Sequence, residues 1–180
     1  MSNGFVSPVL DGEMVRAIER ETIQRFLYER RFLFKGNVLD FGCGAPDTCA
    51  KPRPYEYIVI AGGGKYYGFD PGLGQSPAAF LRGPYDAVLC TQVIQYVEDP
   101  GETLIRLRQA TAIGGHLVMT YPTTWQETEE PDDYWRFTKN GMAYLLATAG
   151  WTVVEQIDRG RIEIPGWPLV LGHGVVAKSE

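Results

Sequence analysis

The sequence contains few of the residues that build disulfide frameworks and metal sites. Among its 180 residues there are three cysteines and two histidines. Cys43, Cys49 and Cys90 cannot form a disulfide framework, and their spacings do not match a zinc site. We therefore expect no bound metal and a reducing compartment, which favours a cytoplasmic location.

The sequence also lacks a basic excess and a long hydrophobic run. It has 17 Lys and Arg against 22 Asp and Glu, a net charge of −5, so nucleic acid is an unlikely partner. No apolar run approaches the roughly 20 residues of a membrane helix. Residues Met1 to Asp11 lack the basic and apolar regions of a signal peptide. We expect a soluble protein without a membrane partner, and we leave open whether it forms oligomers.

What the sequence does have is an alternation of helical and strand patterns in a chain of single-domain length. Hydrophobic residues make up 44% of it, enough for a core. Strands that alternate with helices predict an α/β fold with a doubly wound, mostly parallel sheet, which binds ligands at the carboxyl ends of its strands. The predicted helices are 11–34, 101–112 and 138–149, the predicted strands are 37–41, 66–69, 85–90, 116–120, 151–156 and 169–177, and 55–61 fits either a short helix or a strand.

The first predicted strand ends in a glycine turn with the pattern Asp40-x-Gly42-x-Gly44. Such glycines let the backbone approach a ligand closely. The dinucleotide fingerprint requires a third glycine where this chain has Asp47, which disfavours a nicotinamide oxidoreductase. Asp70 ends the next strand, where a carboxylate can accept hydrogen bonds from both hydroxyls of a ribose.

With these motifs the chain resembles the class I S-adenosylmethionine-dependent methyltransferases from about Gly36 to its end. The glycine turn is similar to their first motif, Tyr67 to Asp70 to their ribose-binding strand, and Tyr85 to Pro100 to their fourth strand and its loop. Gly114 to Met119 resembles their fifth strand, entered through a Gly-Gly turn. All four pieces occur in order with compatible spacing.

The resemblance implies a fold, a cofactor and an activity. The fold is a Rossmann-like sheet of seven strands with an antiparallel last strand, in one methyltransferase domain over 1–180. Its parts are an N-terminal helical segment (1–35), a cofactor-binding half (36–122) and a substrate-side half (123–180). The activity is transfer of a methyl group from S-adenosylmethionine to a small-molecule acceptor, sugar-related or a secondary metabolite. The alternative is a catalytically inactive binding or assembly module.

By the same resemblance, Gly42 and Gly44 pack against the methionine part of the cofactor, Asp40 lies near its amino group, and Asp70 holds the ribose. A turn or cap role is the simpler alternative for Asp70. Residues at the end of the fourth strand line the cofactor in the family, and here these are Thr91 and Gln92. A helix-start role for Thr91 is equally compatible with the sequence.

A catalytic base is not evident. Tyr96 stands where many relatives have histidine, and a tyrosine with a pKa of about 10 is a poor base, so we interpret Tyr96 as a pocket wall. His116 and His173 fit structural roles in strands. The remaining weak catalytic candidates are Asp133, Tyr134 and Glu130 besides Tyr96 itself.

Residues Trp125 to Trp151 resemble one subgroup with a Pro-x-Asp-Tyr-x-Arg-Phe-Thr segment after the fifth strand. Arg136 could clamp an acidic group of the substrate bidentately, or form a salt bridge that orders the loop. The aromatic residues of this segment could line the acceptor pocket or belong to the core, and they are Trp125, Tyr134 and Trp135.

The chain departs from the family after the first and second strands. Pro46, Pro52 and Pro54 argue against the long helix that normally follows the first motif. Pro71 to Pro84 has room for only a short edge strand, at about 79–81, and contains no carboxylate for the adenine amino group. We expect a shortened sheet edge and a looser adenine site, in which Gln75, Ser76 or Leu81 substitutes.

Overall fold

The chain forms a mixed α/β structure in a computed structural model that describes residues 11–44, 53–73, 83–129, 131–164 and 167–180. The first helix, α1 (Gly12–Glu29), begins where the Asp11 carboxylate accepts a hydrogen bond from the Glu13 amide. Its buried side chains, Ile23, Phe26 and Leu27, recur at helical spacing on one face. The helix predicted over 11–34 is thus confirmed, although its last part is a separate 3₁₀ turn, η1 (Arg31–Leu33).

The sheet has six strands in the described part of the chain, in the order β2-β1-β3-β4-β6-β5. β1, β2, β3 and β4 run parallel to one another, while β6 is antiparallel to both β4 and β5. The antiparallel last strand is therefore confirmed. The strands are β1 (Gly36–Phe41), β2 (Gly64–Phe69), β3 (Tyr85–Thr91), β4 (Thr111–Pro122), β5 (Trp151–Ile162) and β6 (Leu169–Ser179).

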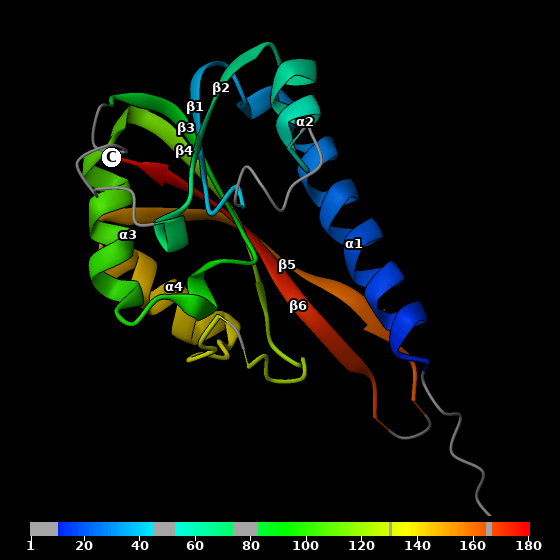
Figure 1. Cartoon of the computed structure of the whole chain (residues 1–180). Helices are drawn as coiled ribbons and strands as arrows, with labels where there is room; N and C mark the ends of the chain where they lie inside the picture. Colours follow the sequence, from blue (N-terminus) through cyan, green and yellow to red (C-terminus); the bar gives the residue numbers. More distant parts are fainter. Residues whose placement is uncertain (1–10, 45–52, 74–82, 130, 165–166) are drawn as a thin grey trace, which may run out of the picture.

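Helices cover both faces of this sheet (Figure 1). α1 and the short α2 (Glu56–Gly62) lie on one face, and α3 (Pro100–Gln109) and α4 (Lys139–Thr148) lie on the other. The segment 55–61, open between helix and strand in the sequence, is therefore helical. α4 begins at the predicted cap, since the Thr138 hydroxyl accepts a hydrogen bond from the Gly141 amide.

Two sequence predictions about the region before β4 are wrong. The helix predicted over 101–112 ends at Gln109, and Gly114-Gly115 lies within β4 rather than before it. Thr111 already pairs with Tyr85, whereas the next pairing is His116 with Ala87, so the intervening residues form a bulge. A Cβ on Gly115 would lie 2.9 Å from the Asp86 carbonyl oxygen, which explains the need for glycine there.

The seven-stranded sheet and its shortened edge stay predictions. The strand expected at about 79–81 and the candidate adenine residues Gln75, Ser76 and Leu81 lie outside the described residues, as do Pro46, Asp47 and Pro52. Within the described part of the chain, no helix combines the length and apolar character needed to cross a membrane.

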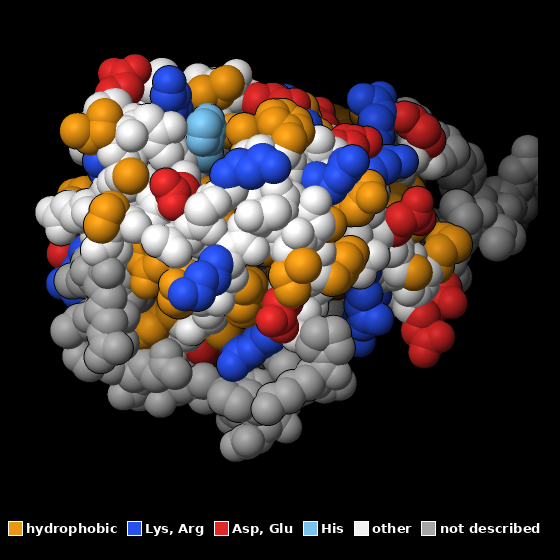
Figure 2. All heavy atoms as spheres, turned by 90° about the horizontal axis from the view of Figure 1, so that it is seen from above, with side chains coloured by type: hydrophobic (Ala, Val, Ile, Leu, Met, Phe, Trp, Pro, Cys, Tyr) orange, Lys and Arg blue, Asp and Glu red, His pale blue; other side chains and the backbone are white. Residues whose placement is uncertain are grey.

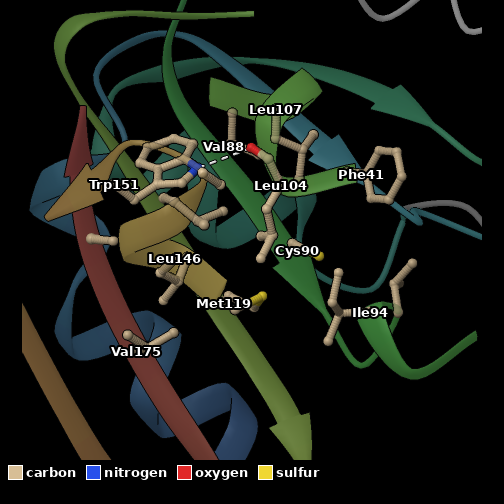
Figure 3. Packing of buried hydrophobic residues seen from close by; sticks show 14 of the residues in the cluster. Phe41, Val88, Cys90, Ile94, Leu104, Leu107, Met119, Leu146, Trp151 and Val175 are labelled. Atoms are coloured by element: carbon tan, nitrogen blue, oxygen red, sulfur yellow. Dashed lines mark hydrogen bonds between the residues drawn. The ribbon is translucent and has the colours of Figure 1, made fainter. Parts of the chain in front are cut away.

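The hydrophobic core is divided by the sheet. On the α3 and α4 face, Trp151 is 2% exposed and its indole N–H donates to the Leu104 carbonyl at 3.0 Å, with Leu107 and Leu146 in the same cluster (Figure 3). On the α1 and α2 face, the helices pack on the alternate residues of the same strands, which are Val38, Ala87, Leu89, Val118 and Val176. Together the two clusters fix the strands whose carboxyl ends carry the site.

The opposite end of the molecule, where β1 to β4 begin, has a mixed surface. Figure 2 shows basic, acidic and hydrophobic side chains interspersed on this face. A shallow hollow of about 310 Å³ lies there, bordered by Phe32, Asp86, Ile113 and His116 among others. Gly42, Asp70, Gln92 and Tyr96 lie at the other end of the strands.

Candidate functional site

A cleft of about 590 Å³ lies at the carboxyl ends of β1, β2 and β3. This volume is in the usual range for small-molecule sites. Four residues singled out from the sequence line it together, namely Gly42, Asp70, Gln92 and Tyr96. The remaining walls are Pro71, Gly72, Val93, Val97, Glu98 and Pro131.

Of the two predicted glycines, Gly42 lines the cleft next to β1, and Gly44, further along the same turn, is not among the lining residues. Gly42 and Gly44 have φ values of 84° and 80°, a region that residues with a Cβ avoid. The amides of Gly42 and Cys43 both donate to the Phe69 carbonyl, at 2.7 and 3.2 Å, so the turn is tied to the end of β2. A Cβ on Gly42 would lie 2.0 Å from Val93 Cγ2, so only glycine leaves room for the turn to reach the cleft wall.

Asp70 has the turn role that the sequence offered as the simpler alternative, and it also borders the cleft. Its Oδ1 accepts a hydrogen bond from the Gly72 amide at 2.9 Å, which makes it a turn residue. It also lines the cleft, one strand away from Gly42. The turn holds the carboxylate at the end of β2, where a ribose role remains a prediction.

Asp40 does not line the cleft, although it lies in the same motif. It is 1% exposed, on the α1 and α2 face of β1, and its Oδ2 accepts a hydrogen bond from the Tyr66 hydroxyl at 2.7 Å. Burial raises the pKa of Asp40 from 3.8 to about 7, against the opposing effects of the Tyr66 hydrogen bond and the charge of Arg53. A direct contact with a cofactor amino group stays a prediction.

The end of β3 contributes an unusual backbone position. Gln92 has a φ of 55°, which is rare for a residue with a side chain. Its amide donates to the Thr120 carbonyl at 3.0 Å and its Nε2 donates to Thr120 Oγ1 at 3.4 Å. Thr91 is buried, and its hydroxyl has no hydrogen-bond partner among the described residues. Of these two predicted cofactor residues, Gln92 reaches the cleft.

Tyr96 ends the 3₁₀ turn η4 (Ile94–Tyr96) and forms part of the cleft wall. The position agrees with its interpretation as a wall residue. Within the described lining there is no histidine, lysine or arginine. The two histidines lie in strands: burial lowers the pKa of both, and His173 Nδ1 lies 3.2 Å from Asp158 Oδ1.

The segment after β4 is ordered by an ion pair. Arg136 contacts both carboxylate oxygens of Asp133, at 2.5 and 2.7 Å, and donates to the carbonyls of Trp125 and Gln126. The hydrogen bonds from Arg136 hold the pKa of Asp133 below its usual value. These contacts match the alternative in which Arg136 orders the loop, with Asp133 as its partner. A substrate role for either residue remains a prediction.

The predicted aromatic residues of this segment do not converge on one pocket. Trp125 borders a separate groove of about 290 Å³ between the start of α1 and β6. The Trp135 indole donates to the Val97 carbonyl at 2.9 Å, beside the cleft, and the exposed Tyr134 hydroxyl donates to Asp132. Glu130 lies outside the described residues.

Sequence reasoning missed Arg53 and Tyr66. Arg53 Nη1 donates to the carbonyls of Gly44 and Cys43, at 2.5 and 3.4 Å, and contacts Cys43 Sγ at 2.7 Å. A lone arginine in a proline-rich stretch gave no signal for this contact. The Tyr66 contact with Asp40 depends on the pairing of β1 with β2, which aligns Val38 with Tyr66 and turns both side chains to one face. In the described chain, no group of three or more His, Cys, Asp or Glu is arranged to hold a metal ion.

Comparison with known proteins gives one family and a consistent fold. A family model described as a methyltransferase domain matches residues 13–156. A search of curated proteins found no match. A S-adenosylmethionine-dependent methyltransferase from Archaeoglobus fulgidus is 14% identical over 88% of this chain and 94% of its own, with a TM-score of 0.66.

Two further solved structures have named activities. The 1,6-didemethyltoxoflavin-N1-methyltransferase of Burkholderia thailandensis, solved with 1,6-didemethyltoxoflavin and S-adenosylhomocysteine, is 18% identical over 94% of this chain and 82% of its own, with a TM-score of 0.62. The magnesium protoporphyrin IX methyltransferase of Synechocystis is 14% identical over 92% of this chain and 87% of its own, also with a TM-score of 0.62. At these identities the similarity shows the fold.

Proposed function

The chain belongs to the methyltransferase family and has the fold of its S-adenosylmethionine-dependent members, and on this basis we propose that it methylates a small molecule at the cleft described above. The enzyme class and the cofactor follow from the family. The acceptor and the roles of individual residues are the proposal.

The observation that carries the proposal is the convergence of Gly42, Asp70, Gln92 and Tyr96 on one cleft at the strand ends. The cleft fits the cofactor for two reasons. A Cβ at Gly42 would collide with Val93, so glycine lets the turn pack directly against the cleft wall, beside which the methionine part would lie. Asp70 is held by its turn at the strand end where a carboxylate can accept hydrogen bonds from ribose hydroxyls.

When bound, S-adenosylmethionine supplies a methyl group already activated by its sulfonium charge. The protein therefore has to bind, orient and exclude water. Val93, Tyr96 and Val97 supply the apolar side of the cleft, while Asp70 and Glu98 give it a negative field that favours a positively charged ligand. Gln92, held by its contacts with Thr120, fixes the backbone between these two sides.

The described lining contains no histidine that could act as a base, so we propose that proximity accounts for most of the acceleration. An acceptor that ionises readily, or that loses its proton after methyl transfer, needs no catalytic base from the protein. The weak catalytic candidates, Tyr96, Asp133 and Tyr134, differ in position: Tyr96 lines the cleft, Asp133 is paired with Arg136, and Tyr134 is exposed. Of the three, Tyr96 is the best placed to contact an acceptor.

A small-molecule acceptor is favoured by the size and walls of the cleft. The protein offers no cationic lining for a polyphosphate among the described residues. Two structural neighbours are named for small molecules, 1,6-didemethyltoxoflavin and magnesium protoporphyrin IX, which supports this class without selecting a compound. A sugar-related acceptor or a secondary metabolite belongs to the same class.

Calorimetric titration with S-adenosylmethionine, S-adenosylhomocysteine and NAD tests the proposal. We expect both sulfur compounds to bind and NAD to give no heat. Asp70→Ala should weaken S-adenosylhomocysteine binding about 10- to 100-fold, because hydrogen bonds to a charged group are lost. Asp132→Ala, which removes an exposed carboxylate outside the cleft lining, is the matched control and should bind normally.

Failure of the wild-type protein to bind either sulfur compound would contradict the proposal. Binding without turnover across a broad panel of acceptors would instead support the inactive module. An untargeted acceptor screen, read as S-adenosylhomocysteine formation, separates these outcomes. Its positive hits would also identify the acceptor class.

A further inference from the structure

Arg53 lies against the glycine turn and is not one of the described residues that line the cleft. Its Nη1 donates to the Gly44 carbonyl and, at longer range, to the Cys43 carbonyl. All of its hydrogen bonds in the described part of the chain are made by Nη1. The side-on pair of donors, Nε and Nη2, makes none there. The spacing of these two donors matches that of the two oxygens of a carboxylate.

The surroundings of Arg53 are otherwise acidic. Asp70 and Glu98 line the cleft, and the buried Asp40 is close enough that the positive charge of Arg53 lowers its pKa. No lysine, arginine or histidine stands among the described lining residues. A ligand carboxylate that entered this cleft without a cation beside it would be repelled.

The cofactor nevertheless carries such a carboxylate in its amino-acid part. If the proposed function holds, that part lies at the turn formed by Gly42 and Gly44. Arg53 is the cation hydrogen-bonded to that turn, and it is fixed there by two carbonyls. An arginine held in this way loses little further side-chain freedom when it binds an anion, which favours affinity.

We propose that Arg53 binds the carboxylate of the cofactor's amino-acid part through Nε and Nη2, while Nη1 continues to hold the glycine turn. The proposal rests on the proposed function and adds a residue to it. Arg53 thus links the shape of the turn to the charge of the ligand. It makes the amino-acid part, and not only the nucleoside, a source of binding specificity.

Titration with two ligands tests the proposal. S-adenosylhomocysteine contains the amino-acid part, and 5′-methylthioadenosine is the corresponding nucleoside thioether without it. For Arg53→Met we expect S-adenosylhomocysteine binding to weaken about 10- to 100-fold. Binding of 5′-methylthioadenosine should change less than about twofold. Arg53→Lys keeps the positive charge but cannot donate two parallel hydrogen bonds. Its affinity for S-adenosylhomocysteine should therefore lie between those of the wild type and of Arg53→Met.

Arg106→Met is the matched control, since Arg106 is an exposed arginine on α3 paired with Glu102. It should leave the binding of both ligands unchanged. In the wild-type protein, the carboxamide of S-adenosylhomocysteine should bind more weakly than the acid by a factor similar to that of Arg53→Met. The same comparison of acid and carboxamide in Arg53→Lys should give a smaller factor than in the wild type, which keeps the inference testable if Arg53→Met does not fold.

The outcomes separate the two proposals. Equal weakening of both ligands by Arg53→Met would assign Arg53 to the structure of the turn alone and overturn the inference. Unchanged binding of S-adenosylhomocysteine would overturn it as well. Failure of the wild-type protein to bind either ligand would instead contradict the proposed function.

Discussion

The two faces of the sheet bury different kinds of side chain. The face under α3 and α4 packs an aliphatic and aromatic cluster around Trp151, whose one polar group is satisfied by the Leu104 carbonyl (Figure 3). The face under α1 and α2 also buries an acid, Asp40, and a base, Arg159, which are 1% and 2% exposed. The same strands therefore bury a hydrophobic cluster on the α3 and α4 face, and both hydrophobic and charged side chains on the α1 and α2 face.

Burial of these charges is costly and incompletely compensated. Burial lowers the pKa of Arg159 from 12.5 to about 10, against the opposing charge of Glu19. Arg159 donates to the His173 carbonyl and to Thr22 Oγ1, both at 3.3 Å, but its Nη2 has no partner among the described residues. Asp40 has the Tyr66 hydroxyl as its hydrogen-bond donor. Asp40 adjoins the glycine turn without lining the cleft, whereas Val93 and Val97, which line it, pack with the α3 and α4 cluster.

The largest expected effect is on the hydrophobic face. Trp151→Ala should lower the free energy of unfolding by about 3–5 kcal/mol, because it leaves a large cavity and removes the indole hydrogen bond to the Leu104 carbonyl. Urea denaturation measures the change. Trp167→Ala is the control: Trp167 is 74% exposed, and its loss should change stability by less than about 0.5 kcal/mol. A loss below about 1 kcal/mol for Trp151→Ala would contradict the assignment of this face as the main stabiliser.

On the charged face, Asp40→Asn should change how stability depends on pH. The pKa of Asp40 is raised to about 7 in the folded protein, so the fold favours the protonated acid. Its contribution to stability is complete below the ordinary value of 3.8 and is lost as the pH rises through about 7. Asparagine does not titrate, so the free energy of unfolding of the variant should rise relative to that of the wild type over this range, by about 2–4 kcal/mol at pH 8.

Denaturation of both proteins at pH 5 and pH 8 measures this gain. Glu129→Gln, at an exposed position of the loop after β4, provides a control without burial and should show no such trend. A constant difference between Asp40→Asn and the wild type at the two pH values would mean that Asp40 is ionised throughout. The α1 and α2 face would then not differ from the other face through the ionisation of a buried acid.

The sequence was informative where local chemistry dictates the backbone. The glycines at 42 and 44 have the positive φ that their residue type permits, and Thr138 and Gly150 bound α4 as their capping preferences require. The order of alternating elements was enough to place Asp70 beside the glycine turn, because parallel strands end at one edge.

The sequence was not informative where distant residues meet. The bulge in β4 depends on the pairing of Thr111 and His116 with β3, and propensity alone extended the preceding helix too far. Arg53 contacts the glycine turn across a proline-rich stretch, which no periodic pattern describes. Trp125 and Pro131 lie in the same segment yet border different hollows, since the fold of that loop depends on the pair of Arg136 with Asp133.

The smallest expected effect concerns the Tyr66 hydroxyl. Tyr66→Phe removes its hydrogen bond to Asp40, which holds the pKa of that acid lower than burial alone would set it. The pKa of Asp40 should therefore rise further. The loss of stability should be about 1 kcal/mol at pH 5, where the acid is neutral, and about 2 kcal/mol at pH 8, where it is ionised in the wild type. In the Asp40→Asn background the loss should be the same at both pH values, because asparagine has no charge to stabilise.

A double-mutant cycle measured by urea denaturation therefore gives a coupling energy that grows with pH. If the coupling is independent of pH, the hydroxyl does not distinguish the ionised acid from the neutral one, and the α1 and α2 face differs from the other in composition rather than in charge.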